Sequence, residues 1–349
     1  MEKPNPQPSR RDLFAAKFPQ GPQPNESETV VDYGPLFHFS SNAMGCEFQV
    51  LCDAGGRKTL AGCVAEGFDL IHFLEQQLSI YRSSSQLALV NRQAFSKPVR
   101  VDPEVFELLE LAREISHFTR GTFDITATPL TRVWKTHRKA RSIPSELELG
   151  KAMESVGYHA LELDRETQSV RFQKKEMVLD LGGIGKGFAL DQLKSHLLSA
   201  QCHDFLIHGG QSSVLSGGQR ADRSGQNKFP WQVAISHPLK TQKKLATLSL
   251  RDKAIGTSGS ARQNYVINGK RLGHIIDPRT GWPAHNLLSV TVLAPTAVLA
   301  DALATAIFVA GPDQAEEICK HFEVGAILIS ETGKILNTIG VNENDIQIH

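Results

Sequence analysis

The sequence predicts an α+β fold. Segments with helical periodicity and segments typical of strands both occur, and they do not alternate as the regular β-α-β units that a doubly wound sheet requires. An Asn-Gly pair at 268–269 stands between two strand-like runs and indicates a β-hairpin. The 349 residues are enough to bury a substantial core without disulfides or a structural metal.

Helices are expected where apolar residues recur at three- and four-residue spacing, as they do over residues 58–78. Asp102-Pro103 marks the start of a second helix, which continues to a stop at Gly121. Ser145 and Glu148 form a capping box that begins a third. Further helices are expected at 186–199, 297–310 and 313–322.

Strands are expected where β-branched and aromatic residues cluster between turn residues. These segments are 47–52, 170–173, 204–208, 231–236, 245–250, 289–293 and 326–330, with hairpin strands at 264–267 and 270–275. Residues 219–229 read as a polar loop.

Residues 1–35 are expected to be a flexible N-terminal arm because they are rich in Pro, Gln and Ser, and residues 36–349 are expected to form one domain. The arm contains Arg10-Arg11, which resembles a twin-arginine export signal, but the apolar stretch that should follow is missing. We therefore expect a cytoplasmic protein, the alternative being export by an atypical twin-arginine-like N-terminus.

Composition excludes several classes of protein. Lys and Arg number 38 against 37 Asp and Glu, and without a basic surplus or basic block the chain does not read as a nucleic-acid-binding protein. No apolar run approaches the roughly 20 residues of a membrane span. The five cysteines are odd in number and contain no Cys-x-x-Cys pair, which favours free thiols in a reducing compartment.

The glycine-rich block at 180–187 is the first candidate site. It is neither a Walker A loop nor a dinucleotide fingerprint, because Gly187 follows Lys186 and Phe188 stands where a third glycine belongs. Asp180, four glycines and Lys186 at a helix start favour a site for an anion or nucleotide. The alternative is a tight strand-to-helix turn with a solvent-exposed lysine.

Asp301 and Thr305 are four residues apart and therefore share one face of an apolar helix. Such a carboxylate needs a partner or a metal ion, and oxygen ligands suit Mg²⁺. The alternative is that Asp301 caps a neighbouring loop while Thr305 bonds back to a carbonyl.

Two further blocks carry weaker signals. His274 stands at a strand end, where it could act as a general base or be an ordinary packed surface histidine. Phe123 could stack on a flat ring and Asp124 accept from ring or sugar donors, with Met44 and Tyr81 serving the same ligand; the alternative for this block is a helix stop that leads into a strand.

In this order the blocks resemble the ApbE family of FAD:protein FMN transferases. The resemblance covers about residues 38–340. The motifs that carry it are Met44-Gly45, Tyr81, Gly121-x-Phe123-Asp124-Ile125-Thr126, Asp180-Leu181-Gly182-Gly183-Ile184-x-Lys186-Gly187, Gly209-Gly210, Thr257-Ser258-Gly259, residues 274–281 and Asp301-Ala302-x-x-Thr305-Ala306.

The resemblance implies a T-fold-like domain of mixed or antiparallel sheets flanked by helices. It implies Mg²⁺-dependent transfer of the FMN half of FAD to a Thr or Ser hydroxyl of a target flavoprotein, with release of AMP. Two alternatives stay open, an FAD pyrophosphatase that gives free FMN and AMP, and a non-catalytic flavin-binding protein.

The resemblance also assigns roles to residues. It places Met44, Tyr81, Thr122, Phe123, Asp124, Asp180, Lys186 and Ile275 around FAD. It makes Asp301, Thr305 and a backbone oxygen near Gly183 the ligands of Mg²⁺, and His274 the base for the acceptor hydroxyl, with Asp301 as the second catalytic residue.

Overall fold

The computed structural model describes residues 33–349, apart from 54–59, 241, 261–263 and 268–269. The arm expected over 1–35 lies outside the described residues except for its last three, of which Tyr33 forms an isolated bridge with Asp222. The Asn-Gly turn expected at 268–269 also lies outside them.

An eight-stranded sheet organises the molecule, and every neighbouring pair of its strands is antiparallel. In spatial order its strands are β1 (Leu36–Ala43), β2 (Cys46–Asp53), β6 (Phe205–Gly209), β7 (Ser213–Gly217), β12 (Ala254–Gly259), β15 (Leu287–Ala294), β16 (Gly325–Ser330) and β17 (Ile335–Ile339). The expected α+β class with antiparallel sheets and flanking helices is confirmed.

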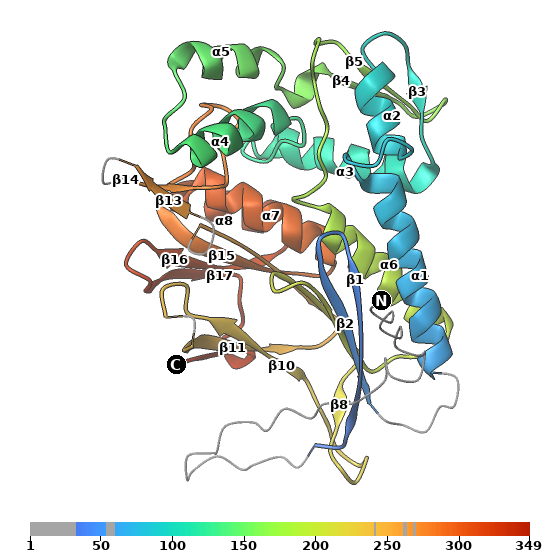
Figure 1. Cartoon of the computed structure of the whole chain (residues 1–349). Coiled ribbons are helices and arrows are strands. Elements are labelled where there is room, and N and C mark those ends of the chain that lie inside the picture. The colour runs from blue at the N-terminus through green and yellow to red at the C-terminus, as the bar shows by residue number, and fades with distance from the viewer. Residues whose placement is uncertain (1–32, 54–59, 241, 261–263, 268–269) are drawn as a thin grey trace, which may run out of the picture.

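One face of this sheet is covered by helices (Figure 1). They are α1 (Leu60–Leu78), α6 (Gly185–Ser199), α7 (Ala297–Ala310) and α8 (Pro312–His321). α7 packs on β12 and β15, α6 on α7, and α1 on α6. The main core fills this interface, where Phe48, Phe205 and Phe308 are fully buried. Each such ring buries a large apolar area and so contributes strongly to the stability of this core.

The opposite face of the sheet carries a small sheet of β10 (Trp231–Ser236), β11 (Lys244–Leu250) and β18 (Ile346–Ile348). Side chains of β10 are alternately buried and exposed, as a half-buried strand requires. Trp231 and Leu248 of the small sheet meet Ile255 and Leu293 of the large sheet in a second core. The indole Nε1 of Trp231 donates to the carbonyl of Gly217 at 3.1 Å, which fixes the two sheets together.

A third layer stands above the helices in Figure 1. It contains α2 (Gln86–Gln93), α3 (Pro103–Phe118), α4 (Thr128–Ala140), α5 (Glu146–Glu154), and a sheet of β3 (Val99–Arg100), β5 (Ser169–Phe172) and β4 (Leu161–Asp164). Two-stranded ladders join β8 (Arg220–Ala221) to β9 (Lys228–Phe229) and β13 (Asn264–Ile267) to β14 (Lys270–Gly273). Single 3-10 turns lie at Tyr158–Ala160 and Glu343–Asp345.

Several local predictions are confirmed. The capping box at the start of α5 is formed, with Glu148 N donating to Ser145 Oγ and Ser145 N to Glu148 Oε2. The hairpin strands pair as expected. None of the five cysteines forms a disulfide within the described residues, and Cys52 and Cys319 are buried. Among the described helices, none is both long and apolar enough to span a bilayer.

Other elements were not predicted. No helix or strand was expected at the positions of α2, α4, β1, β3, β4, β7, β12, β17 and β18. The alternative for the block after Gly121 was a strand, and no strand forms there. The chain instead continues through a turn into α4. The stretch 219–229, expected to be a loop, contains the short ladder of β8 and β9.

Candidate functional site

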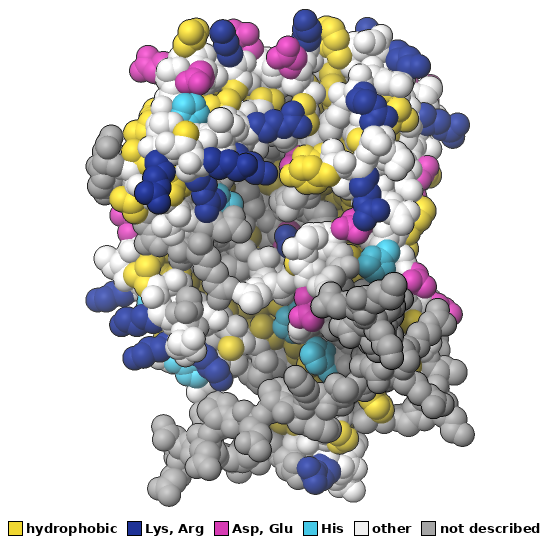
Figure 2. All heavy atoms as spheres, viewed as in Figure 1, with side chains coloured by type: hydrophobic (Ala, Val, Ile, Leu, Met, Phe, Trp, Pro, Cys, Tyr) yellow, Lys and Arg dark blue, Asp and Glu magenta, His cyan; other side chains and the backbone are white. Residues whose placement is uncertain are grey.

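A cavity of about 1130 Å³ opens between the helical layers and the two packed sheets (Figure 2). Its wall is built from segments far apart in the sequence, including the starts of α6 and α7, β12 and residues 274–278. It is lined by every site residue expected from the sequence except Met44, namely Tyr81, Thr122, Phe123, Asp124, Asp180, Gly183, Lys186, His274, Ile275, Asp301 and Thr305.

Asp301 is the buried acid of this cavity. Its Oδ2 accepts a hydrogen bond from the backbone N–H of Gly187 at 2.8 Å. The Ser213 hydroxyl lies 2.7 Å from Oδ1 and 2.9 Å from Oδ2. These donors hold the carboxylate in one orientation at the junction of α6, α7 and β7.

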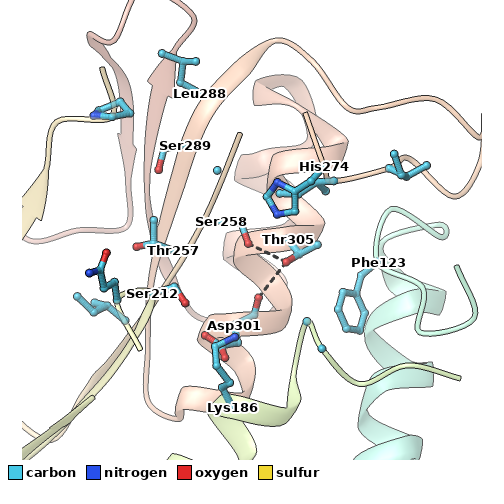
Figure 3. A pocket seen from close by; sticks show the side chains of 18 of the residues that line it. Phe123, Lys186, Ser212, Thr257, Ser258, His274, Leu288, Ser289, Asp301 and Thr305 are labelled. Carbon is cyan, nitrogen blue, oxygen red and sulfur yellow. Dashed lines mark hydrogen bonds between the residues drawn. The ribbon is translucent and has the colours of Figure 1, made fainter. Parts of the chain in front are cut away.

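Burial raises the pKa of Asp301, and the positive charge of Lys186 opposes that rise. The hydrogen bonds from Ser213 and Gly187 also favour the ionised form. Lys186 lies in the first turn of α6, close to Asp301 in the close-up of Figure 3. A cation at this carboxylate would be stabilised by the same low-dielectric surroundings that make the isolated anion costly.

Thr305 lies one turn after Asp301 on the same face of α7, so both side chains reach the cavity (Figure 3). Its Oγ1 is 2.8 Å from the hydroxyl of Ser258 and 3.4 Å from the carbonyl oxygen of Asp301. Gly183 is nearby, because a Cβ placed on it would stand 4.0 Å from Thr305 Oγ1. A carboxylate, a hydroxyl and a glycine backbone therefore converge.

These contacts also match the alternative in which Asp301 and Thr305 have structural roles. Asp301 does bind a neighbouring backbone amide, and Thr305 does bond back to a carbonyl. The two roles are compatible, because each carboxylate or hydroxyl oxygen has a further lone pair for another ligand.

α6 and α7 cap one another reciprocally. Asp301 of α7 accepts from the first turn of α6 at Gly187. Asp191 of α6 accepts from the first turn of α7, with Ala297 N at 2.9 Å and Val298 N at 2.8 Å. The four orphan amides at each helix start are partly satisfied in this way. The arrangement fixes the position of Asp301 relative to Lys186.

Two glycines permit the close helix packing. A Cβ on Gly187 would stand 2.2 Å from the carbonyl oxygen of Ala297, and one on Gly256 of β12 would stand 2.4 Å from the carbonyl carbon of Ala300. Both contacts are with backbone, which cannot rotate away. The glycine block therefore serves helix packing as well as the cavity.

The amides of the glycine block are largely used inside the protein. Gly182 N donates to Asp180 Oδ1 at 2.9 Å and Gly185 N to the Leu181 carbonyl at 2.7 Å. The segment is tied down by Asn91, which bonds both the N–H and the C=O of Leu179. Asp180 thus shapes the turn beneath the cavity and at the same time lines it.

Asp124 and its neighbours form a second wall. The carboxylate of Asp124 accepts from Thr126 N and Oγ1 and from Tyr158 N, at 2.7–2.9 Å. Burial raises its pKa, against the effect of these donors. Phe123 is buried with its ring edge toward Gly183, and the buried hydroxyl of Thr122 has no hydrogen-bond partner among the described residues.

Tyr81 and Met44 lie at the margin. Tyr81 is 83% exposed at the cavity edge, so none of the described residues buries its ring. Met44 occupies the turn between β1 and β2 with φ of +51°, and its N–H donates to Glu75 Oε1 at 2.8 Å. Met44 packs against the main core beside the site without lining the cavity.

His274 is exposed and Ile275 is half-buried, both on the cavity wall. The turn that follows is rigid, because Arg279 donates from Nε and Nη2 to the carboxylate of Asp277 at 2.9 and 2.8 Å. Gly281 closes the turn by donating to the Asp277 carbonyl. His274 is therefore attached to a fixed support.

Sequence reasoning missed three residues of this site. Ser213 follows the Gly209-Gly210 pair, but no local pattern connects it to Asp301. Asp191 stands inside the glycine block's helix with no spacing signal for its role as a cap. His208 lines the cavity from β6, and burial, assisted by the charge of His38, lowers its pKa to about 4.

Within the described part of the chain, no group of three or more His, Cys, Asp or Glu side chains is arranged to hold a metal ion. The oxygen set at Asp301, Thr305 and Gly183 contains one carboxylate, one hydroxyl and a carbonyl, which is chemistry that suits Mg²⁺ rather than a softer metal.

Comparison with known proteins relates the chain to one family of enzymes. The family model described as "ApbE family" matches residues 44–328. The chain is 30% identical over 264 residues to the FAD:protein FMN transferase of Haemophilus influenzae, covering 73% of this chain and 75% of that protein. It is 31% identical over 270 residues to the Escherichia coli K12 enzyme of the same name, covering 76% and 75%.

Solved structures give the same result. A crystal structure of the ApbE protein from Thermotoga maritima superposes with a TM-score of 0.77 at 25% identity, covering 87% of this chain and 97% of that one. The flavin transferase ApbE from Vibrio cholerae superposes with a TM-score of 0.75 at 25% identity, covering 87% and 96%.

Proposed function

This chain belongs to the ApbE family, and from that membership we propose that it transfers the FMN half of FAD to a Thr or Ser hydroxyl of a target flavoprotein and releases AMP. Its relatives over three quarters of its length are named FAD:protein FMN transferases, so flavin transfer is the activity of the chain. The acceptor hydroxyl, the AMP product and the use of Mg²⁺ are parts of the proposal.

The cavity is the observation that carries the proposal. Its volume of about 1130 Å³ is large enough for a dinucleotide, since drug-sized ligands occupy roughly 300–1,000 Å³. Its wall offers a buried aromatic ring at Phe123, a cation at Lys186, and at Thr122 a hydroxyl that has no hydrogen-bond partner among the described residues. Isoalloxazine, ribityl hydroxyls and pyrophosphate need these three kinds of group.

The residues present fit a magnesium ion. Asp301, Thr305 and the Gly183 carbonyl would hold it, because all three supply hard oxygen donors in one part of the cavity. When bound there, Mg²⁺ supplies charge neutralisation at the phosphate oxygens and at the leaving AMP. Ser213 and Gly187 N keep the Asp301 carboxylate aimed at that position.

The chain's own groups do the rest of the chemistry. Lys186 places a positive charge beside the pyrophosphate, and Phe123 and Tyr81 offer rings to the flavin or adenine. His274, exposed on its rigid turn, accepts the proton from the acceptor Thr or Ser as its oxygen attacks the phosphorus of the FMN half. The P–O bond to the AMP half breaks, so the products are a phosphoester-linked FMN and AMP.

Water in place of the acceptor hydroxyl would make the same site an FAD pyrophosphatase. The exposed position of His274 favours transfer, because a base at the mouth of the cavity can reach a hydroxyl on another protein. A non-catalytic flavin-binding protein would not need a base at the mouth of the cavity.

One incubation separates these functions. The full-length chain is mixed with FAD, Mg²⁺ and a flavoprotein acceptor domain, the acceptor is weighed by intact mass spectrometry, and nucleotides are separated by chromatography. FMN transfer adds the mass of FMN less one water to the acceptor and yields AMP. An unmodified acceptor with free FMN would establish the pyrophosphatase, and unchanged FAD would refute both reactions.

A further inference from the structure

α4 presents a concentrated set of positive charges to solvent. Five of the ten residues from 132 to 141 are Lys or Arg, and all five are exposed. We call this set the basic face of α4; it consists of Arg132, Lys135, Arg138 and Lys139 of the helix, together with its C-cap residue Arg141. The expectation that the chain has no basic block was wrong, because a net charge of +1 hides this local cluster.

The opposite side of α4 is anchored next to the proposed catalytic histidine. Leu130 and Trp134 are buried on that side, and Trp134 Nε1 donates to the Gly281 carbonyl at 2.7 Å. The Trp134 ring also packs against Trp282 and Tyr265. Gly281 and Trp282 belong to the turn that follows His274, so the basic face has a fixed position relative to the site.

The charges of this face are not neutralised within the described structure. None of its five side chains forms an ion pair with a carboxylate of the described residues. Arg132, Lys135 and Lys139 are spaced by three and four residues, so they lie on one stripe and repel one another. The helix dipole favours cations only in the last turn, which leaves Arg132 and Lys135 without that compensation.

The basic face adjoins the mouth of the cavity. Ala127, Thr128 and Thr131, from the start of α4, line the cavity, and the basic face continues from there for about 15 Å along the helix. Figure 2 shows Lys and Arg side chains gathered beside the central hollow, where Figure 1 labels α4. The connection between β10 and β11 adds exposed Lys240 and Lys243 beside the cavity-lining Pro238.

We propose that the basic face of α4 docks an acidic surface of the acceptor protein and holds its hydroxyl over His274. The inference rests on the proposed transfer, because only a transferase must bind a second macromolecule at the cavity mouth. An acidic partner fits by charge complementarity, which raises association rates and fixes orientation.

A membrane or nucleic acid fits this surface less well. A helix that binds bilayers buries an exposed apolar face in the lipid, but the apolar side of α4 is occupied by the turn at Gly281 and Trp282. A single-stranded nucleic acid needs exposed aromatic rings among the cations, and the exposed positions of α4 carry none.

The test uses charge reversal on the full-length chain. The docking variant is Arg132→Glu, Lys135→Glu and Lys139→Glu, which leaves Arg138 in place because it lies over the Tyr265 ring. A matched control reverses three exposed basic residues that do not line the cavity, Lys97→Glu, Arg100→Glu and Lys175→Glu. The FAD dissociation constant of both variants is measured first, to show that the cavity is intact.

The probe is a fluorescent peptide with one Thr among Asp and Glu residues, beside a counterpart with Asn and Gln in their places. Fluorescence anisotropy gives each affinity at about 50 mM and about 300 mM salt. We expect the parent and the control to bind the acidic peptide about tenfold more tightly than the amide peptide at low salt, and the docking variant to lose that preference. FAD affinity stays within about twofold, because these side chains do not touch the cavity.

Equal affinity for the two peptides in the parent would overturn the proposal, as would an equal loss in the control variant. Vesicles containing phosphatidylglycerol are run in parallel, and charge-dependent binding of the parent to them without binding of the acidic peptide would also overturn it. The peptide measurement requires no turnover, so docking can fail while FMN transfer holds, and transfer can fail while docking holds.

Discussion

Replacing Gly187 with alanine is the sharpest test of the helix packing that builds the site. The new Cβ would stand 2.2 Å from the Ala297 carbonyl oxygen, 2.5 Å from its carbon and 2.7 Å from Val298 N. A separation of 3.0 Å is about the closest that real Cβ atoms reach, so α6 and α7 must move apart by about 0.8 Å. If the helices shift by this amount along the hydrogen bond, the distance from Gly187 N to Asp301 Oδ2 increases from 2.8 Å to about 3.6 Å, which is beyond hydrogen-bonding distance.

The expected loss of stability is about 2–4 kcal/mol, from overpacking together with a buried donor left without an acceptor. In a chain of this length, about 1 kcal/mol changes the thermal midpoint by about 1.5 °C, so the midpoint should fall by about 3–6 °C. FAD affinity in the presence of Mg²⁺ should fall by at least about tenfold, since Asp301 and Lys186 no longer meet in their present geometry.

Gly62 supplies the matched control. It also lies in a helix, but a Cβ placed on it meets nothing within 4 Å. Gly62→Ala should therefore raise stability by about 0.5–1 kcal/mol, because alanine has the higher helix propensity. Near-ultraviolet circular dichroism gives the midpoints and calorimetry gives the affinities. A Gly187→Ala protein with the parent's midpoint and FAD affinity would refute the packing argument.

Four further changes test the site. Asp301→Asn should keep the folded structure but abolish the response to Mg²⁺, since an amide accepts the bond from Gly187 without binding the cation; an unchanged Mg²⁺ titration would contradict this. His274→Ala should slow transfer about a hundredfold or more and leave FAD affinity nearly unchanged, and equal losses of both would indicate a binding role. His208 is held neutral, with a pKa of about 4, so its burial stabilises the fold above pH 6.5 and that contribution is lost as pH falls toward 4. The loss is at most about 3 kcal/mol, and denaturant titrations of His208→Gln at several pH values should show a flatter decline than the parent. Asn91→Ala removes both bonds to Leu179 and should lower stability by about 2 kcal/mol with weaker FAD binding; parental values in both assays would show that this clamp is dispensable.

Much of the fold could be predicted from local patterns. Residues 58–78 have a regular apolar stripe, and α1 is found there because that stripe packs against α6. The capping box at Ser145 needs only a local spacing, and it forms as expected. Predictions of this kind are confirmed because nearby residues alone determine the local structure.

The missed elements depend on distant partners. β12 contains Gly256 and Gly259, and glycine has little intrinsic preference for strands. It forms because β7 and β15 pair with it on either side and because Gly256 lets α7 approach closely. α4 was missed because its exposed face is almost entirely charged or polar, and Trp134 identifies its buried side only once the turn at Gly281 is in place.

The same limit applies to the site. Residue types and family motifs indicated which acids, lysine, histidine and flavin-contacting residues belong to the site. Of these expected site residues, the structure brings all except Met44 to one cavity. The residue types and motifs could not show that Asp301 binds Gly187, that Ser213 completes its shell, or that Asp191 caps α7. Those contacts join residues 88 to 114 positions apart, and no local spacing encodes them.

The reciprocal caps between α6 and α7 have a consequence for synthesis of the protein on the ribosome. The partners of Gly187 N and of the Asp191 carboxylate lie more than a hundred residues further along the chain, so they are made after α6. Contacts of such long sequence separation form late in folding. We therefore expect a truncated chain to bind FAD only when it includes the residues up to α7, so that FAD binding would report completed folding.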